Sequence, residues 1–447
     1  MSDSRWPRLL RSCVVFTCSV LWGLPVAAAP LTGFTVVEGH VVDAAGAAVP
    51  IRGVNHFGFN TDILVPQFLW TMGWKEQLAQ IKALGFNAVR LPIAPATLHV
   101  LTPVDQFSYI EPRRNADLLG KTSLQVLDLW MAEADRLGLY VLIDMHSVST
   151  KRQYPSWFVL DSADWNLTWN GLPYTQANWV SDLAFVAARY VTNAHFMGID
   201  LYNEPNGAVR WFTGDATHPD PTYYWKTAAE TAGLAVLAAN PSLLVFVEGI
   251  NGNYDGVENP DVPMNWGEDL QPHAYQPLAI PAAKLVLAPH TYGPDVYVKS
   301  SFLAGNFPAN LAADWNTLFG QFFPAYAVVP GEWGGRYGFG GNDRDVTWQN
   351  AFVDYLLSKG MRDSFYWCYT PNSGDTGGIL DDNLDVRQDK MALLRRLWGG
   401  SAPAGTGGST PASASSSSAS AGAGGALDPR LLLVAGILPL LRRRRAH

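Results

Sequence analysis

The sequence predicts an α/β fold in which eight strand-and-helix units close into a (β/α)8 barrel. Apolar and β-branched runs alternate with helix-like stretches along the middle of the chain, as they do in proteins with parallel sheets. Successive runs end 35 to 58 residues apart, which leaves room for a loop, a helix and the next strand. No glycine-rich phosphate loop follows the first run, and this counts against an open doubly wound sheet.

Each predicted strand ends at a polar or aromatic residue. The ends are expected near Asn55, Arg90, His146, Glu204, Glu248, His290, Glu332 and Trp367. Helices are expected between them at residues 74–84, 122–137, 178–190, 223–239 and 346–359. The carboxyl ends of the strands form the functional face of such a barrel, so these side chains are expected to gather at one site.

Before the barrel, the segment FTVVEGHVVDAAGAAVP predicts a short hairpin that closes the barrel floor. The predicted organisation has five parts. They are a signal peptide at 1–28, the hairpin and barrel entry at 29–52, the barrel domain at 53–398, a linker at 399–425 and a tail at 426–447.

Both ends of the chain indicate export. Three arginines precede the apolar stretch from Cys13 to Val26, and small residues allow cleavage after Ala28, which is typical of a bacterial secretory signal. A membrane-anchoring helix is the alternative. Near the other end, the apolar stretch from Leu431 to Leu441 is shorter than the ~20 residues that a membrane-spanning helix needs. Four arginines follow it, and we interpret this tail as a sorting signal or a retained, transiently membrane-associated segment of a secreted or cell-surface protein.

Composition narrows the classes of partner. The formal net charge is −8, but the first 28 residues carry +2 and the last 22 carry +4, so the region between them carries −14. Such acidity argues against nucleic acid. The 17 Trp residues favour a neutral polymer that is bound by stacking and hydrogen bonds. After removal of the signal only Cys368 remains, so no internal disulfide is expected and this thiol should be buried.

Two glutamates stand where chemistry is expected. Glu204 follows Asn203 in the string GIDLYNEP, and Glu332 lies in VVPGEWGG. Hydrolysis of a glycosidic bond needs one carboxyl group that protonates the leaving oxygen and a second that attacks or stabilises the anomeric carbon.

The ordered motifs resemble those of glycoside hydrolase family 5, of the cellulase type, over about residues 35 to 398. The matching strings are RGVN at 52–55, VRLPI at 89–93, DMH at 144–146, NEP at 203–205, HTY at 290–292, GEWG at 331–334 and NSGDTGGIL at 372–380. The last string favours the bacterial endoglucanases. The resemblance implies a retaining, endo-acting hydrolase of β-1,4-glucan that needs no cofactor and no metal.

The resemblance also implies roles for single residues. Glu204 would be the acid/base and Glu332 the nucleophile. Supporting or substrate-binding roles would fall to Arg90, His146, Asn203, His290, Tyr292 and Trp367. Arg90 and Tyr292 would keep Glu332 ionised. Asn203 would bind the 2-hydroxyl of the sugar, His290 and His146 would lie beside the sugar, and Trp367 would stack beneath it.

Elementary electrostatics agrees with this division of roles. Burial and a nearby second carboxylate would raise the pKa of Glu204, so that it keeps a proton to donate. When Glu332 becomes a glycosyl ester it loses its charge, and Glu204 is then free to act as a base towards water. We expect the two carboxyl groups to lie about 5 to 5.5 Å apart, as retention requires.

Other functions remain open at this point. The same barrel could serve a β-mannanase, a mixed-linkage glucanase or a transglycosylase, or a non-catalytic glycan-binding surface protein. Metal-dependent hydrolysis would use His146, His290 and Asp144, but no His-x-His pair ends the first strand. A structural calcium ion also stays open. The expected partner is a β-glucan, the expected state is a monomer, and Glu248 is interpreted as a structural or rim residue.

Overall fold

The computed structural model describes residues 1 and 33–399, apart from residue 152 and residues 160–172, 212–219 and 252–263. Its centre is a sheet of eight parallel strands. In sheet order they are β10 (Ser364–Tyr366), β3 (Arg52–Asn55), β4 (Ala88–Ile93), β5 (Tyr140–Met145), β6 (Phe196–Asp200), β7 (Leu244–Val247), β8 (Leu285–Leu287) and β9 (Ala327–Val328).

The two outer strands of this sheet meet and close it. The backbone N–H of Phe365 donates to the carbonyl of Pro330 at 2.8 Å, and that of Trp367 donates to Trp333 at 2.9 Å. The segment after β9 therefore lies beside β10, and the sheet curls into the barrel that the sequence predicts.

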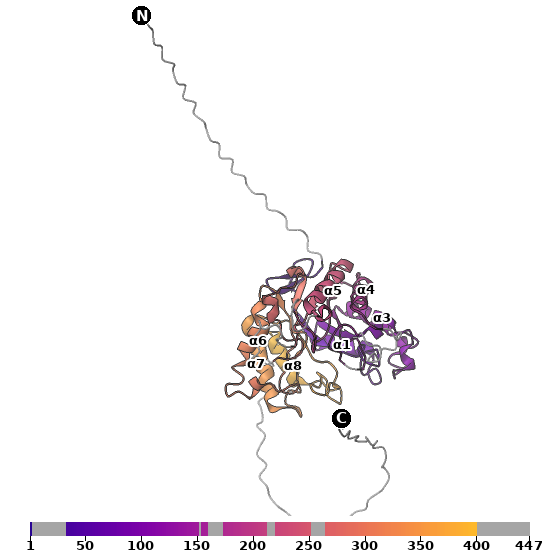
Figure 1. Ribbon diagram of the computed structural model, residues 1–447. Coiled ribbons are helices and arrows are strands. Elements are labelled where there is room, and N and C mark those ends of the chain that lie inside the picture. The colour runs from indigo at the N-terminus through magenta and orange to yellow at the C-terminus, as the bar shows by residue number, and fades with distance from the viewer. Residues whose placement is uncertain (2–32, 152, 160–172, 212–219, 252–263, 400–447) are drawn as a thin grey trace, which may run out of the picture. The chain divides into compact units, whose positions relative to one another are not determined.

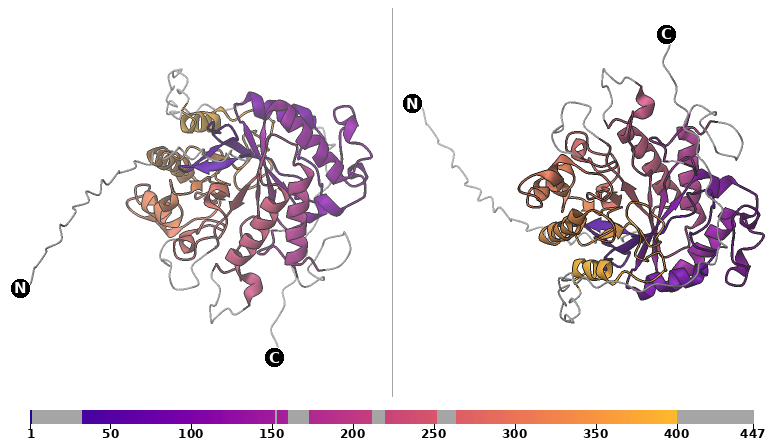
Figure 2. Two further views of the ribbon diagram at one scale, coloured as in Figure 1. Left: turned by 90° about the horizontal axis from the view of Figure 1, so that it is seen from above. Right: turned by 90° about the horizontal axis from the view of Figure 1, so that it is seen from below.

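Helices surround the strands (Figures 1 and 2). They are α1 (Trp74–Ala83), α2 (Pro95–His99), α3 (Ser123–Leu137), α4 (Gln176–Arg189), α5 (Trp225–Ala239), α6 (Leu311–Leu318), α7 (Asp343–Lys359) and α8 (Gln388–Leu397). The five predicted helices are confirmed as α1, α3, α4, α5 and α7. The sequence analysis predicts none of α2, α6 and α8. The 5 residues of α2 and the 8 of α6 give few turns over which a helical period can be recognised. α8 has 10 residues, as many as α1, and was missed.

The predicted hairpin is confirmed. Strands β1 (Thr35–Val37) and β2 (His40–Val42) pair in antiparallel fashion. The backbone N–H of Phe34 donates to the carbonyl of Ser242 at 2.9 Å, just before β7. Phe34 and Val41 belong to the apolar cluster inside the barrel, so the hairpin closes the end of the barrel where the strands begin.

The strands are buried on both faces. One cluster of apolar side chains fills the barrel interior, and a second, larger cluster lies between the strands and the helices. Strands in this position read as continuous apolar runs, which is why the sequence predicts them well. They end earlier than expected, however, because β6 stops at Asp200 and β9 at Val328, four residues before Glu204 and Glu332. Both glutamates therefore stand on the loops beyond the strands.

Among the residues that the structure describes, no helix combines the length and the hydropathy that crossing a membrane requires. The predicted signal peptide apart from residue 1, the predicted linker apart from residue 399, and the whole predicted tail lie outside these residues. Cys368 is a buried free thiol, as expected.

Candidate active site

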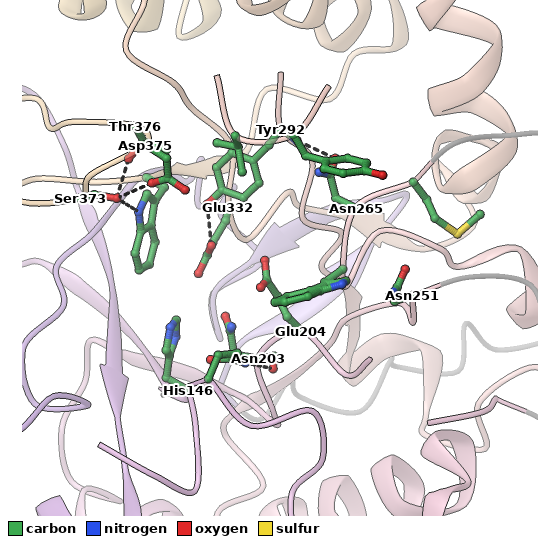
Figure 3. Close-up of a pocket in the computed structure, with 16 residues that line it drawn as sticks. His146, Asn203, Glu204, Asn251, Asn265, Tyr292, Glu332, Ser373, Asp375 and Thr376 are labelled. Carbon is green, nitrogen blue, oxygen red and sulfur yellow. Dashed lines mark hydrogen bonds between the residues drawn. The ribbon is translucent and has the colours of Figure 1, made fainter. Parts of the chain in front are cut away.

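A cavity of about 570 Å³ opens at the carboxyl ends of the strands. Six of the eight residues proposed from the sequence line it (Figure 3): His146, Asn203, Glu204, Tyr292, Glu332 and Trp367. The other two, Arg90 and His290, are fully buried behind the cavity wall and bind residues that line it. The fold thus brings all eight together, although Arg90 and His290 act on the cavity only through the residues that line it.

The carboxylates of Glu204 and Glu332 enter the same space from different loops (Figure 3). The Nδ1 atom of His290 lies 3.2 Å from Oε1 of Glu204 and 3.5 Å from Oε2 of Glu332. A nitrogen of His290 and one oxygen of each glutamate all lie within 4.8 Å of one another. Two carboxylates so close can act on the same acetal of a bound sugar.

Arg90 on β4 organises the charges behind the cavity. Its Nη1 donates to Glu332 Oε1 at 2.6 Å. Its Nε donates to Asp200 Oδ2 at 2.9 Å, and its Nη2 lies 3.1 Å from both Asp144 and Glu248. The guanidinium also donates to the side-chain oxygens of Asn55 and Asn203 at 3.1 and 2.9 Å. Five N–H groups in a fixed fork suit such a crowded site, and a smaller cation could not bind all of these partners.

Glu332 also accepts a hydrogen bond from a phenol. The hydroxyl of Tyr292 donates to Glu332 Oε2 at 2.6 Å. Burial and the charge of Glu332 both raise the pKa of Tyr292 well above its ordinary value, so the phenol keeps its proton. The backbone N–H of Tyr292 is held by Asn265 Oδ1 at 3.0 Å. Arg90 and Tyr292 thus donate to both oxygens of Glu332.

Glu204 experiences the opposite environment. Burial raises the pKa of its carboxyl group, the hydrogen bond from His290 lowers it, and the charge of Glu332 raises it, with a net upward shift. Burial disfavours the charge of His290, but Glu248, Glu332 and Glu204 outweigh it and raise the pKa of His290 well above 6.5. Glu204 therefore holds a proton at a higher pH than an ordinary glutamate does.

Aromatic rings form one wall of the cavity. The ring of His146 stacks with Trp367 at a centroid distance of 5.7 Å and an angle of 12°. The ring of Phe57 stacks with the same indole at 5.5 Å and 9°. His146 is oriented by Asp144, whose Oδ2 lies 2.7 Å from its Nδ1. A flat apolar surface of this kind suits the C–H face of a pyranose.

The loop NSGDTGGIL at residues 372–380 binds the indole of Trp367. The sequence analysis used this string for the family resemblance but assigned it no role. Trp367 Nε1 donates to Ser373 Oγ at 3.0 Å. Ser373 in turn donates to Asp375 at 3.1 Å and accepts from Thr376 at 2.8 Å. All three loop residues line the cavity (Figure 3).

Several functional neighbours were missed or misjudged from the sequence. Glu248 was interpreted as a structural or rim residue. It is fully buried and hydrogen-bonded to Arg90 and to the backbone of Glu204, so it is a structural residue and not a rim residue. Asp200 was not proposed, although it is the last residue of β6 and lies at the same end of the barrel as the proposed residues. His56 is buried against Tyr369, while the adjacent Phe57 makes the contact with Trp367.

The loop tryptophans divide clearly. Trp266 lines the cavity and is 46% exposed. Trp157, Trp211 and Trp333 are fully buried in the core. Two further tryptophans, at 165 and 169, lie outside the described residues.

The structure also assembles groups with the composition of metal ligands, which spacing along the sequence did not indicate. One is Glu204, His290 and Glu332, and the other is Asp200, Glu248 and His290. The ligand atoms of each group lie within 4.8 Å of one another. In both groups the imidazole and the carboxylates are already bound to each other or to Arg90, which accounts for their proximity.

Comparisons with known proteins agree with this geometry. A family model described as cellulase (glycosyl hydrolase family 5) matches residues 42–373. The major extracellular endoglucanase of Xanthomonas campestris pv. campestris is 47% identical over 385 residues, which cover 86% of this chain and 75% of that protein. An endoglucanase of Paenibacillus polymyxa is 31% identical over 83% of this chain and 88% of its own length.

Solved structures give the same result. The catalytic domain of the major endoglucanase from Xanthomonas campestris superposes with a TM-score of 0.75 at 46% identity, over 82% of this chain and 99% of that chain. An endocellulase from Pyrococcus horikoshii, solved in complex with cellotetraose, superposes with a TM-score of 0.73 at 34% identity, over 82% and 98%. From the matched family model and these identities, the chain belongs to glycosyl hydrolase family 5, the cellulase family.

Proposed function

We propose that this chain is an endoglucanase that hydrolyses internal β-1,4 bonds of a cellulose-type glucan with retention at the anomeric carbon. Glu332 is the nucleophile and Glu204 is the acid/base. The observation that carries the proposal is the closeness of the two carboxylates, each with an oxygen within 4.8 Å of the other. Retaining glycosidases hold their carboxyl groups about 5 to 5.5 Å apart, whereas inverting ones leave room for a water at roughly 6.5 to 9.5 Å.

The surroundings of the two groups support the division of roles. Arg90 and Tyr292 stabilise the charge with which Glu332 attacks the anomeric carbon. The raised pKa of Glu204 preserves the proton that the leaving oxygen takes up. Formation of the glycosyl ester removes the charge of Glu332, which was raising that pKa, so Glu204 then accepts a proton from the attacking water.

The substrate class is proposed from the relatives and from the cavity. Relatives that cover most of the chain are named endoglucanases. The stacked face of Trp367 and the amide of Asn203 offer the contacts that a neutral glucosyl unit needs. A mannanase or a mixed-linkage glucanase would use the same two glutamates, because the loops around the cavity select the sugar.

Two measurements test the proposal. Initial rates on carboxymethylcellulose, barley β-glucan, mannan and xylan should be highest on the first two. Proton NMR of the first-formed product of a short cello-oligosaccharide should show the β-anomer before mutarotation. Appearance of the α-anomer first would disprove the retaining mechanism, and a clear preference for mannan would disprove the substrate assignment.

Two rival functions are separated by simple controls. A non-catalytic glycan-binding protein would release no reducing ends, whereas the wild type should release them and Glu332→Gln should not. A metal-dependent hydrolase would lose activity after exhaustive chelation, whereas the proposed mechanism predicts unchanged rates.

We further propose that the mature enzyme is a secreted monomer that starts after Ala28. The sequence of the first 28 residues and the name of the extracellular relative support export. N-terminal sequencing of protein recovered from the medium of an expressing bacterium tests the cleavage position, and light scattering tests the oligomeric state.

A further inference from the structure

Glu248 is a buried carboxylate that the two-glutamate mechanism does not use, yet it contacts three residues of the site. It follows β7 directly and has no solvent exposure. Its Oε2 accepts the backbone N–H of Glu204 at 2.7 Å. Its Oε1 lies 3.1 Å from Nη2 of Arg90 and 3.1 Å from Nε2 of His290.

The contact with the backbone of Glu204 falls at a strained position. Glu204 has a φ of +51°, in the left-handed region that residues other than glycine rarely adopt. Such a conformation persists only where neighbouring groups hold it, and the carboxylate of Glu248 binds the N–H of this very residue. The direction in which the Glu204 side chain leaves the backbone therefore depends on Glu248.

The surrounding backbone closes tightly over this carboxylate. A Cβ atom on Gly267 would lie 2.4 Å from Glu248 Oε2, so only glycine fits here. Gly267 also has a φ of +71°. Because Glu248 itself has no solvent exposure, its hydrogen bond to the backbone of Glu204 lies in a low-dielectric environment that strengthens it.

A second path runs through His290. The Nε2 side of the ring faces Glu248 and the Nδ1 side faces Glu204, at 3.1 and 3.2 Å. With a carboxylate on each side, the imidazole is oriented and its charge is stabilised. Replacement of the carboxyl group of Glu248 would weaken that orientation on the side of the ring that Glu204 does not touch.

We propose that Glu248 is a positioning residue for the acid/base, which it holds through the backbone N–H of Glu204 and through the imidazole of His290. The inference rests on the proposed role of Glu204. In this proposal Glu248 does not contact the substrate. Substitution of Glu248 should therefore lower kcat/KM most for substrates whose leaving group needs a proton.

The variant Glu248→Gln tests this. The amide keeps the shape of the side chain but replaces one oxygen with an NH₂ group. That NH₂ group must face either the backbone N–H of Glu204 or the donors of Arg90 and His290. On barley β-glucan we expect kcat/KM to fall about 100-fold, at the lower end of the contribution of general acid catalysis. On dinitrophenyl cellobioside, whose leaving group needs no proton, the fall should stay below about fivefold. The limb of the pH profile at high pH should also move.

A double-mutant cycle distinguishes positioning from a merely structural role. In a Glu204→Ala background, the further change Glu248→Gln should alter kcat/KM on β-glucan less than about twofold, because residues that act through one group are not additive. Independent roles would multiply the two losses, and that result would overturn the proposal. Equal losses of Glu248→Gln on both substrates would also overturn it.

The matched control is Asp363→Asn. Asp363 is likewise a buried carboxylate that binds a backbone N–H, that of Ile51 at 2.6 Å, but it lies where β10 begins, at the other end of the barrel. Its variant should lose stability without discrimination between leaving groups. If Glu248→Gln does not fold, Glu248→Asp is the second variant, because it keeps the carboxyl group beside Arg90. Its shorter side chain should give the same discrimination between leaving groups, with a smaller loss of kcat/KM.

The same assays separate this inference from the proposed function. If Glu204→Ala itself does not discriminate between β-glucan and dinitrophenyl cellobioside, the proposed role of Glu204 fails. If Glu204→Ala discriminates and Glu248→Gln does not, only the role of Glu248 fails.

Discussion

At the scale of single residues, Arg90 determines the electrostatics of the site. Four carboxylates surround its guanidinium without solvent access: Asp144, Asp200, Glu248 and Glu332. Burial opposes the charge of Arg90, but these carboxylates outweigh it and raise its pKa well above the ordinary value. The arginine is therefore a permanent cation around which the other groups take their protonation states.

The conservative change Arg90→Lys should consequently be severe. A lysine ammonium has three donors on a flexible stem and cannot replace the fork, so some buried carboxylates would lose their partner. We expect the free energy of unfolding to fall by about 3 to 5 kcal/mol, the usual effect of breaking a buried pair. Chemical denaturation measures the loss, and activity on β-glucan should fall with it.

The matched control is Arg189→Lys. Arg189 binds Asp128 through two nitrogens at 2.7 and 2.6 Å, but both side chains are one-third exposed. Exposed pairs contribute about 1 kcal/mol or less. If the two lysine variants were equally stable, burial would not be the reason for the importance of Arg90.

At the scale of elements, α8 holds the loop that supports Trp367. Lys390 of α8 is fully buried, and its Nζ donates to the carbonyls of Thr376 and Gly378 at 3.0 Å each. Burial lowers the pKa of Lys390 to about 8. α8 thus fixes the backbone of the loop at Thr376, three residues beyond Ser373. Ser373 in turn accepts a hydrogen bond from the indole of Trp367.

Replacement of this lysine should loosen the loop. Lys390→Met leaves two buried carbonyls without a donor, at about 1 to 3 kcal/mol each. We expect thermal unfolding to move down and KM for cello-oligosaccharides to rise, because Trp367 loses its support. Lys359→Met on α7, which removes one surface hydrogen bond to Asn316, is the control and should change neither. An unchanged melting temperature for Lys390→Met would contradict the interpretation.

The start of α7 contains a pH-dependent contact. Asp345 Oδ2 accepts from the backbone of Tyr337 and from Gln349 at 2.9 and 2.6 Å. Burial, together with the neighbouring carboxyl group of Asp295, raises the pKa of Asp345 to about 7. A carboxyl group whose pKa is raised on folding stabilises the protein while it is protonated, and this contribution is lost as the pH rises from about 4 to 7.

The variant Asp345→Asn should remove that dependence, since its amide stays neutral. Melting temperatures recorded between pH 4 and pH 8 should fall less steeply for the variant than for the wild type. Asp343→Asn changes an exposed residue two positions earlier and should give a curve parallel to the wild type. Parallel curves for all three proteins would show that the contact does not titrate in this range.

At the scale of the whole molecule, the barrel and its hairpin form one compact unit, whose described residues end at residue 399. The eight residues proposed from the sequence and both apolar clusters lie between residues 34 and 397. We expect a protein of residues 29–403 to keep kcat/KM and the melting temperature of the full chain. A shorter protein that also lacks residues 29–51 should not fold, because Phe34 and Val41 fill the barrel interior. A loss of activity in the first truncation would show that the C-terminal residues contribute to the site.

Much of this molecule could be predicted because its signals are local. Strands buried on both faces appear as apolar runs, and Arg90, Glu204 and Glu332 stand at or just after such runs. The contact of Glu248 with the backbone of Glu204 could not be predicted, because the two residues lie 44 positions apart in the sequence. The contact between Lys390 and the loop before it, and the stacking of Phe57 on Trp367, depend likewise on how distant segments meet.

The excess of carboxyl groups around the single guanidinium affects which polysaccharides the enzyme can cleave. Arg90 and His290 supply two cations, while Asp144, Asp200, Glu248 and Glu332 supply four acidic groups within the same small volume. Burial raises the pKa of Asp200 to about 6 and also raises the pKa of Glu248, so the excess of negative charge develops as the pH rises above about 6. Above that pH a uronic acid or an ionised ether substituent at the scission point would be repelled. Pectic chains should therefore resist attack, and chemically modified cellulose should be cut only where unsubstituted stretches occur.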